Sequence, residues 1–289
     1  MVFRNGPSWA PAGAALALAM LFASATQAAA VEPWLTLPPT PTIPKADVSG
    51  RAPVDGVKIW YAEFGQGKPV LFLHGGLANS NYWGHQVRAL VAAHYKVIVM
   101  DSRGHGRSTR DAQPYSYDLM SQDVVALLDY LKVPKVALVG WSDGAIIGLD
   151  VAMHHPDRLT RLFAFGANYD VAGMNTAPSD VGNLYFARVG QEYAALSPTP
   201  DGFKSFLAQI GSMWPTQPHW TKADLAKITT PTWIVDGDHD ESITHDQPRT
   251  LADWIPNGRL LIEPGVSHFA FIQNPDQFNA DLLRFLNAK

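Results

Sequence analysis

The chain contains 289 residues, of which 47% are hydrophobic and 17% are charged, and its formal net charge at pH 7 is −4. This composition is typical of a globular protein with a substantial core, and it lacks the basic excess that characterises nucleic-acid-binding proteins. Because the chain has no cysteine, disulfide bonds, thiolate chemistry and lipid attachment through an N-terminal cysteine are excluded.

The N-terminal segment predicts a secretory signal peptide over residues 1–30. Arg4 supplies a positive charge, residues 10–23 form an apolar stretch, and three alanines at 28–30 form a small-residue cleavage site before Val31. An uncleaved anchor is the alternative, although the stretch is shorter than the roughly 20 residues of a membrane span. We therefore expect an exported protein, periplasmic in a Gram-negative bacterium, with no stable membrane insertion after cleavage.

The next segment, residues 31–49, is rich in proline and threonine, which favours an extended linker or a surface strap. Residues 50–168 then alternate between two patterns. Strand composition occurs at 56–65, 69–73, 95–100, 136–139 and 162–165, and helical patterns at 82–93, 117–131 and 145–154. This alternation predicts an α/β fold with a mostly parallel, doubly wound sheet.

Residues 169–225 interrupt the alternation. They show no convincing strand, carry helical patches and are rich in aromatic residues, so we interpret them as a helical cap inserted over the sheet. Most of these aromatics are expected in the core of the cap, with a minority lining a substrate pocket. The alternation resumes over 226–289, with strands at 232–236 and 259–262 and helices at 247–254 and 276–286.

A serine between two glycines follows the apolar run 135–139, in the sequence Gly-Trp-Ser-Asp-Gly at 140–144. This pattern is typical of a sharp strand-to-helix turn that holds its serine in a strained conformation with the hydroxyl exposed. Ser142 is therefore the candidate nucleophile. A serine hydroxyl needs a base to take its proton and a third group to orient that base.

Two loops at strand ends supply these partners. His268 follows the strand predicted at 259–262 and is the candidate base, while Asp240 follows the strand at 232–236 and is the candidate acid. Asp238 is the competing acid, and Asp236 is interpreted as the end of the strand. The chain order Ser, Asp, His is the one expected for a nucleophile on such a turn.

The glycine-rich segment His74-Gly75-Gly76-Leu77 follows the strand predicted at 69–73. Such a loop lets backbone N–H groups point into a site, so the N–H groups of Gly76 and Asp143 are the candidate oxyanion hole. Leu77 and the side chain of Asp143 are candidate substrate contacts. We interpret His74 as a structural residue that fixes the loop.

Together these motifs resemble the α/β-hydrolase superfamily over residues 50–289. The resemblance also includes residues 101–108, which are usually structural there, and 237–240 and 267–269. It implies the α/β-hydrolase fold and a serine hydrolase that cleaves a small carboxylic ester through an acyl-enzyme, without a cofactor or a metal. Lactone hydrolysis, carbon–carbon bond hydrolysis, acyl transfer and perhydrolysis use the same triad and stay open. A ligand-binding sensor with little turnover is a further alternative.

The sequence Gly-Trp-Ser-Asp-Gly, with Phe-Gly-Ala-Asn at 165–168, resembles the valacyclovirase or biphenyl-hydrolase-like group. In that group the acid beside the nucleophile receives the ammonium of α-amino-acid esters, which implies that Asp143 anchors a cation. The alternative is that Asp143 only stabilises the N-terminus of the following helix. The chain departs from that group at Ala145, where a second glycine is usual.

Overall fold

The computed structural model describes residues 1–3, 5–6 and 31–288. Residues Val31–Lys289 form one compact unit, and Met1–Ala30 form another. The apolar stretch and the cleavage site of the expected signal peptide fall within 7–30 and so lie outside the described residues. Within the described ranges, no helix is both long enough and apolar enough to cross a membrane.

An eight-stranded sheet forms the centre of the Val31–Lys289 unit, in the order β1-β2-β4-β3-β5-β6-β7-β8. The strands are β1 Val48–Val54, β2 Val57–Phe64, β3 Lys68–Leu73, β4 Tyr95–Met100, β5 Val136–Trp141, β6 Leu159–Phe165, β7 Thr232–Gly237 and β8 Gly258–Glu263. Strands β1 and β2 are antiparallel to their neighbours, and the other six are parallel. The prediction of a mostly parallel sheet is confirmed, and the carboxyl ends of β3, β5, β7 and β8 share one edge.

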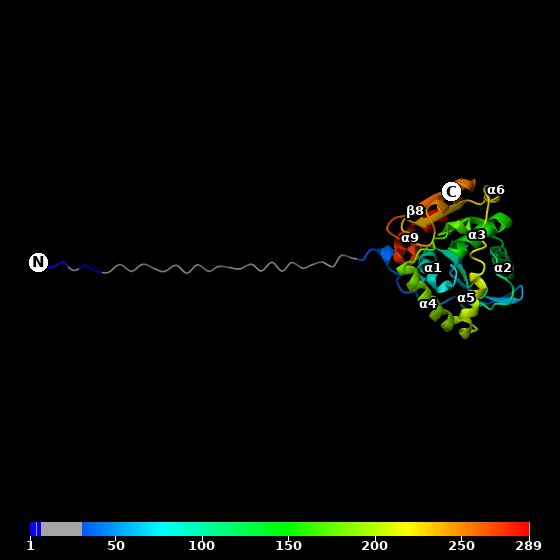
Figure 1. The fold of residues 1–289 in the computed structure, drawn as a ribbon, viewed down its shortest axis with the longest axis horizontal. Coiled ribbons are helices and arrows are strands. Elements are labelled where there is room, and N and C mark those ends of the chain that lie inside the picture. The colour runs from blue at the N-terminus through cyan, green and yellow to red at the C-terminus, as the bar shows by residue number, and fades with distance from the viewer. Residues whose placement is uncertain (4, 7–30, 289) are drawn as a thin grey trace. The chain divides into compact units, whose positions relative to one another are not determined.

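Helices cover both faces of this sheet, because the central strands are apolar runs that must be buried on both sides. The helices are α1 Gly84–Ala92, α2 Tyr117–Tyr130, α3 Asp143–His154, α4 Asp180–Leu196, α5 Phe203–Gly211, α6 Lys222–Leu225, α7 Asp246–Trp254, α8 Ala270–Gln273 and α9 Pro275–Asn287. Helix α1 packs on β4 and contacts α9, whereas α2 packs on α3, which lies against β5 and β6 (Figure 1).

Strand β1 was not predicted, and its first two residues, Val48 and Ser49, lie within the expected 31–49 linker or strap. Its sequence contains Gly50 and Pro53, which weaken a strand signal, but β1 is an edge strand, where proline is tolerated. The preceding residues form a strap on the surface of the unit. The guanidinium of Arg188 in α4 donates to the carbonyl of Leu37 at 2.8 Å and to that of Pro38 at 2.6 Å.

The expected cap region contains α4, α5 and α6 between β6 and β7, and no strand lies there among the described residues. Helices α4 and α5 contact each other (Figure 1). Tyr193 of α4 and Phe206 of α5 are buried and stacked, with ring centroids 5.2 Å apart. Phe186 remains 55% exposed, so the aromatics divide between the cap core and its surface.

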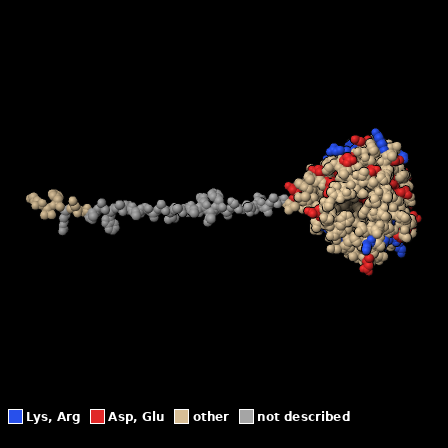
Figure 2. Space-filling model, viewed as in Figure 1, with Lys and Arg blue, Asp and Glu red and all other residues tan. Residues whose placement is uncertain are grey.

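Charged side chains of both signs are interspersed over the visible face of the Val31–Lys289 unit (Figure 2). A nucleic-acid-binding surface needs a continuous basic stripe to attract phosphates. The mixed pattern on this face differs from such a stripe.

Glu263, the last residue of β8, has a buried carboxyl group with no hydrogen-bond partner among the described groups. Burial, reinforced by Asp281 and opposed by Arg284, raises the pKa of Glu263 from 4.5 to about 8. The folded protein therefore binds a proton that the unfolded chain has released between these values. Stability should fall as pH rises through this window, by up to about 1.4 kcal/mol per pH unit.

We expect Glu263→Gln to remove this pH dependence, because the amide does not titrate. The variant should become increasingly more stable than the wild type between pH 5 and pH 9. Urea denaturation across that range checks the prediction, with Glu32→Gln at an exposed carboxyl as the control. Parallel stability curves for Glu263→Gln and the wild type would contradict it.

Candidate active site

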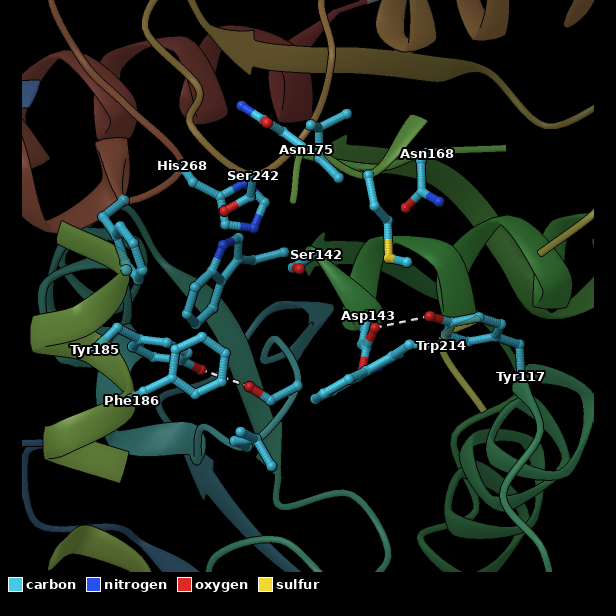
Figure 3. Close-up of a pocket in the computed structure, with 17 residues that line it drawn as sticks. Tyr117, Ser142, Asp143, Asn168, Asn175, Tyr185, Phe186, Trp214, Ser242 and His268 are labelled. Atoms are coloured by element: carbon cyan, nitrogen blue, oxygen red, sulfur yellow. Dashed lines mark hydrogen bonds between the residues drawn. The ribbon is translucent and has the colours of Figure 1, made fainter. Parts of the chain in front are cut away.

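Ser142 lies between the end of β5 and the start of α3, at a sharp turn. Its φ is 54° and its ψ is −123°, a strained conformation for a residue with a side chain. The Ser142 N–H donates to the carbonyl of Phe165 at 2.9 Å, which anchors the turn to the neighbouring strand β6. The side chain faces a pocket that His268 also lines (Figure 3).

His268 and Asp240 form a buried pair at the same edge of the sheet. The imidazole Nδ1 and the Asp240 Oδ2 are 2.6 Å apart. The other oxygen of Asp240 accepts the backbone N–H groups of Ser242 at 2.7 Å and Ile243 at 2.8 Å. Because Nδ1 is occupied by Asp240, Nε2 is the ring nitrogen that remains to receive a proton from a substrate or nucleophile.

Burial and neighbouring charges shift the pKa values of His268 and Asp240 in opposite directions. Burial lowers the pKa of His268, but the charges of Asp240, Glu241 and Asp143 outweigh it and raise that pKa above its ordinary value. Burial likewise opposes ionisation of Asp240, yet the imidazole lowers the pKa of its carboxyl. These shifts favour an ionised Asp240 and make the imidazole of His268 a stronger base.

The side chain of the competing acid, Asp238, contacts Gly265 and His239 and not His268. Its Oδ1 accepts the backbone N–H of Gly265 at 2.7 Å and also contacts the imidazole of His239 at 2.7 Å. Asp238 therefore holds the loop that carries His268 without touching that histidine. Asp236 does not end its strand, because β7 continues to Gly237.

The expected oxyanion loop follows β3 and is held from two sides. The hydroxyl of Tyr185, in α4, donates to the carbonyl of Gly76 at 2.5 Å. On the other side, Nε2 of the buried His74 accepts the N–H of Ser102 at 3.0 Å. The first intrahelical bonds of α3 begin at Ala145, so the N–H of Asp143 precedes them and points out of the helix end.

The carboxylate of Asp143 is buried and held by two neutral donors. Tyr117, at the start of α2, donates its hydroxyl to Oδ1 at 2.8 Å, and Trp214 donates its indole N–H to Oδ2 at 3.0 Å (Figure 3). Burial raises the pKa of Asp143 despite these bonds. Sequence reasoning missed both donors. Trp214 belongs to the aromatic-rich 169–225 segment, which gave a general signal, whereas Tyr117 gave none.

The pocket around Ser142 has a volume of about 220 Å³. Six of its seventeen lining residues are Phe, Tyr or Trp, and Leu77, the candidate substrate contact, also lines it. Polar side chains of Asn168, Asn175 and Ser242 line it together with Asp143 (Figure 3). A pocket of this size and character fits a small acyl compound with an apolar part and a few polar groups.

One group of metal-ligating side chains occurs among the described residues. Donor atoms of Asp118, Asp150 and His154 lie within 4.8 Å of one another. None of the three lines the pocket around Ser142. Asp240, which could have joined a metal site with nearby acidic and histidine residues, is instead paired with His268.

Comparison with known proteins identifies the family. Residues 68–205 match the family described as the alpha/beta hydrolase fold. The chain is 32% identical over 273 residues to the non-heme chloroperoxidase CPO-A1 of Kitasatospora aureofaciens, covering 81% of this chain and 97% of that protein. This chain belongs to the α/β-hydrolase family. The more specific resemblance to the valacyclovirase or biphenyl-hydrolase-like group stays a prediction.

Other α/β-hydrolases similar to this chain carry different activities in their names. A 2-hydroxy-6-oxo-6-(2'-aminophenyl)hexa-2,4-dienoic acid hydrolase of Metapseudomonas resinovorans is 29% identical, over 81% of this chain and 89% of its own. The solved structure of Est816, named as an N-acyl homoserine lactone degrading enzyme, is 30% identical with a TM-score of 0.63. It covers 81% of this chain and 99% of its own.

Gly76 has no room for a side chain in this α/β-hydrolase. A Cβ there would lie 2.5 Å from Oδ2 of Asp143 and 2.8 Å from Cζ2 of Trp214. We expect Gly76→Ala to displace the oxyanion loop and to lower kcat/KM by about 10², the effect of losing one oxyanion donor. Steady-state kinetics on a substrate that the wild type turns over check this. Gly182→Ala is the control, because Gly182 lines the same pocket but its nearest neighbour is 3.6 Å away. Equal losses in both variants would contradict the assignment.

Proposed function

We propose that the protein is a serine hydrolase that cleaves a small carboxylic ester through an acyl-enzyme on Ser142. The observation that carries this proposal is the 2.6 Å contact between His268 and the buried Asp240, beside a pocket that Ser142 enters from a strained turn. A base held by a buried acid, with a serine facing the same pocket, is the arrangement that makes a hydroxyl nucleophilic.

The reaction begins when Oγ of Ser142 attacks the ester carbonyl carbon and its proton passes to Nε2 of His268. The N–H groups of Gly76 and Asp143 hold the resulting oxyanion. The carbonyl re-forms as the carbon–oxygen bond to the alcohol breaks, and the alcohol leaves with the proton from His268. Water then attacks the acyl-enzyme and gives a proton to the same nitrogen. The acid is released as Ser142 recovers its proton.

The environment of Asp143 favours a substrate that carries an ammonium group near the ester, as an amino-acid ester does. The carboxyl group of Asp143 is buried, and the donors that it receives, Tyr117 and Trp214, are neutral. Among the described residues, His268 is the charged group that lowers its pKa. A bound ammonium would supply the counter-charge that this carboxyl lacks. The same carboxylate repels anionic substrates.

Lactone hydrolysis is the second candidate, because a lactone is a cyclic ester that the same steps would open. Est816, which is similar over nearly its whole length, is named as a lactone-degrading enzyme. The polar amides of Asn168 and Asn175 in the pocket suit a substrate with an additional polar group. Lactones and open esters are therefore compared in the same assay.

We also propose that the enzyme is exported. The support is the pattern of Arg4, the apolar stretch at 10–23 and the three alanines before Val31. Expression of the full chain with a C-terminal tag, followed by cell fractionation and N-terminal sequencing, tests this. A tagged protein that stays in the cytoplasm with its original N-terminus would contradict it.

We expect the protein from Val31 onward to hydrolyse short esters, and Ser142→Ala to abolish turnover because the acyl group then has no acceptor. Retained turnover in Ser142→Ala would show that the proposed chemistry is wrong. The assay compares short acyl esters, aminoacyl esters and lactones.

In the same assay, Asp143→Asn should lower kcat/KM for an aminoacyl ester by about 10- to 100-fold more than for the neutral ester of the same shape, since one charged hydrogen bond is lost. The neutral ester is the internal control for damage to the oxyanion hole. An equal loss on both substrates would leave Asp143 only its helix-terminal role.

A further inference from the structure

Asp236 is a fully buried acid that the proposed reaction does not yet use. It lies in β7, immediately before Gly237, and its side chain is 0% exposed. Its Oδ1 accepts the N–H of Gly237 at 3.0 Å. Its Oδ2 is buried and has no donor among the described groups. As a carboxylate, this oxygen would be an unsatisfied buried charge, which is costly in a protein interior.

The neighbour of that oxygen is itself an acceptor. Asp240 follows four residues later across a tight turn, in which its N–H donates to the carbonyl of Gly237 at 3.3 Å. Across this turn the carboxyl groups of Asp236 and Asp240 interact, and each shifts the pKa of the other. Asp240 must stay ionised to pair with His268. Two adjacent buried carboxyl groups do not both ionise, so the proton resides on the member that lacks other donors. Asp240 has the imidazole and two backbone N–H groups, whereas Asp236 has a single N–H on its other oxygen.

We propose that Asp236 is a neutral carboxylic acid whose Oδ2–H donates to Asp240 and thereby positions the acid of the triad. Asp236 is thus a positioning residue that acts through Asp240 and does not touch the substrate. The hydrogen bond adds a further donor to the Asp240 carboxylate, beside the imidazole and the two backbone N–H groups, and withdraws negative charge from it. The proposal rests on the proposed function, because it assumes that Asp240 and His268 act as acid and base.

The surrounding charges agree with this assignment. Burial and the charge of Asp240 raise the pKa of Asp236 well above its ordinary value. Glu241, on the same loop, raises it further and accepts the backbone N–H of His268 at 3.3 Å. The charge of Asp143, which follows Ser142 in the chain, raises the pKa of His268. Glu263 of β8 lies on the opposite face, because Asp236 pairs in register with the residue before it.

The test uses substitutions that separate a neutral donor from a charge. Asp236→Asn keeps the shape, and the N–H of Gly237 orients the amide oxygen so that the amide NH₂ faces Asp240. Asp236→Ala removes the donor. Asp246→Asn, at an exposed carboxyl in the first turn of α7, is the control that removes one negative charge at a distance.

We expect Asp236→Asn to retain ester hydrolysis within about threefold and to leave the acid limb of the pH profile in place, because a neutral donor is preserved. In Asp236→Ala, kcat should fall about tenfold. The acid limb should also move to higher pH, because Asp240 without its donor is more basic and raises the pKa of His268. A shift of the acid limb to lower pH in Asp236→Asn would overturn the proposal, since it would mean that a negative charge had been removed.

A measurement without turnover separates this proposal from the proposed function. The titration of His268 is followed by NMR in the Ser142→Ala background, with its signal assigned by its loss in His268→Gln. Asp236→Asn should leave this titration unchanged, and a lowered pKa of His268 in Asp236→Asn would overturn the proposal. This result does not depend on whether Asp236→Ala folds. Ester turnover that survives Ser142→Ala would overturn the proposed function, while this titration would still report the state of Asp236.

Discussion

The site depends on how closely helix α3 approaches strand β3. A Cβ at Gly144 would lie 2.3 Å from the carbonyl oxygen of Leu73 and 2.7 Å from that of His74, so only glycine permits the contact. This contact places the first turn of α3 beside the loop after β3, where the two candidate oxyanion donors belong. The positive φ of Ser142 is a consequence of the same tight reversal and costs on the order of 1–3 kcal/mol. The surrounding packing holds that strain, so Ser142 and the candidate N–H donors are oriented before a substrate binds.

Hydrogen-bond donors, more than burial, distinguish the acids around the imidazole. Asp240 and Asp143 are both buried, but each has donors on both oxygens. Asp240 receives its donors from the backbone and the imidazole, which favour a permanent charge, whereas Asp143 receives only a phenol and an indole. Asp236 has no donor on its second oxygen within the part of the chain that the structure describes. These donor sets fit the proposed roles, in which Asp240 pairs with His268, Asp143 receives a cation and Asp236 retains its proton.

Much of this arrangement follows from local sequence patterns. Strand, turn and helix signals are continuous in the chain. They therefore predict the parallel strands, the strand-to-helix turn at Ser142 and the loops of Asp240 and His268. Contacts between distant residues are not encoded in this way. Tyr117 and Trp214 lie 26 and 71 residues from Asp143, so no local pattern links them to it. Strand β1 was missed because its edge position, which makes its proline acceptable, is a property of the assembled sheet.

The cap and the core cannot be treated as independent parts of the site. Tyr185 of α4 holds the carbonyl of Gly76, and Trp214 holds the carboxylate of Asp143. Arg188, one turn from Tyr185, is in turn bonded to the N-terminal strap. A substitution that reshapes the cap to admit another substrate therefore also moves the oxyanion loop. Substrate preference and rate should change together in cap variants, because the same side chains form the pocket wall and orient the groups that stabilise the developing charge.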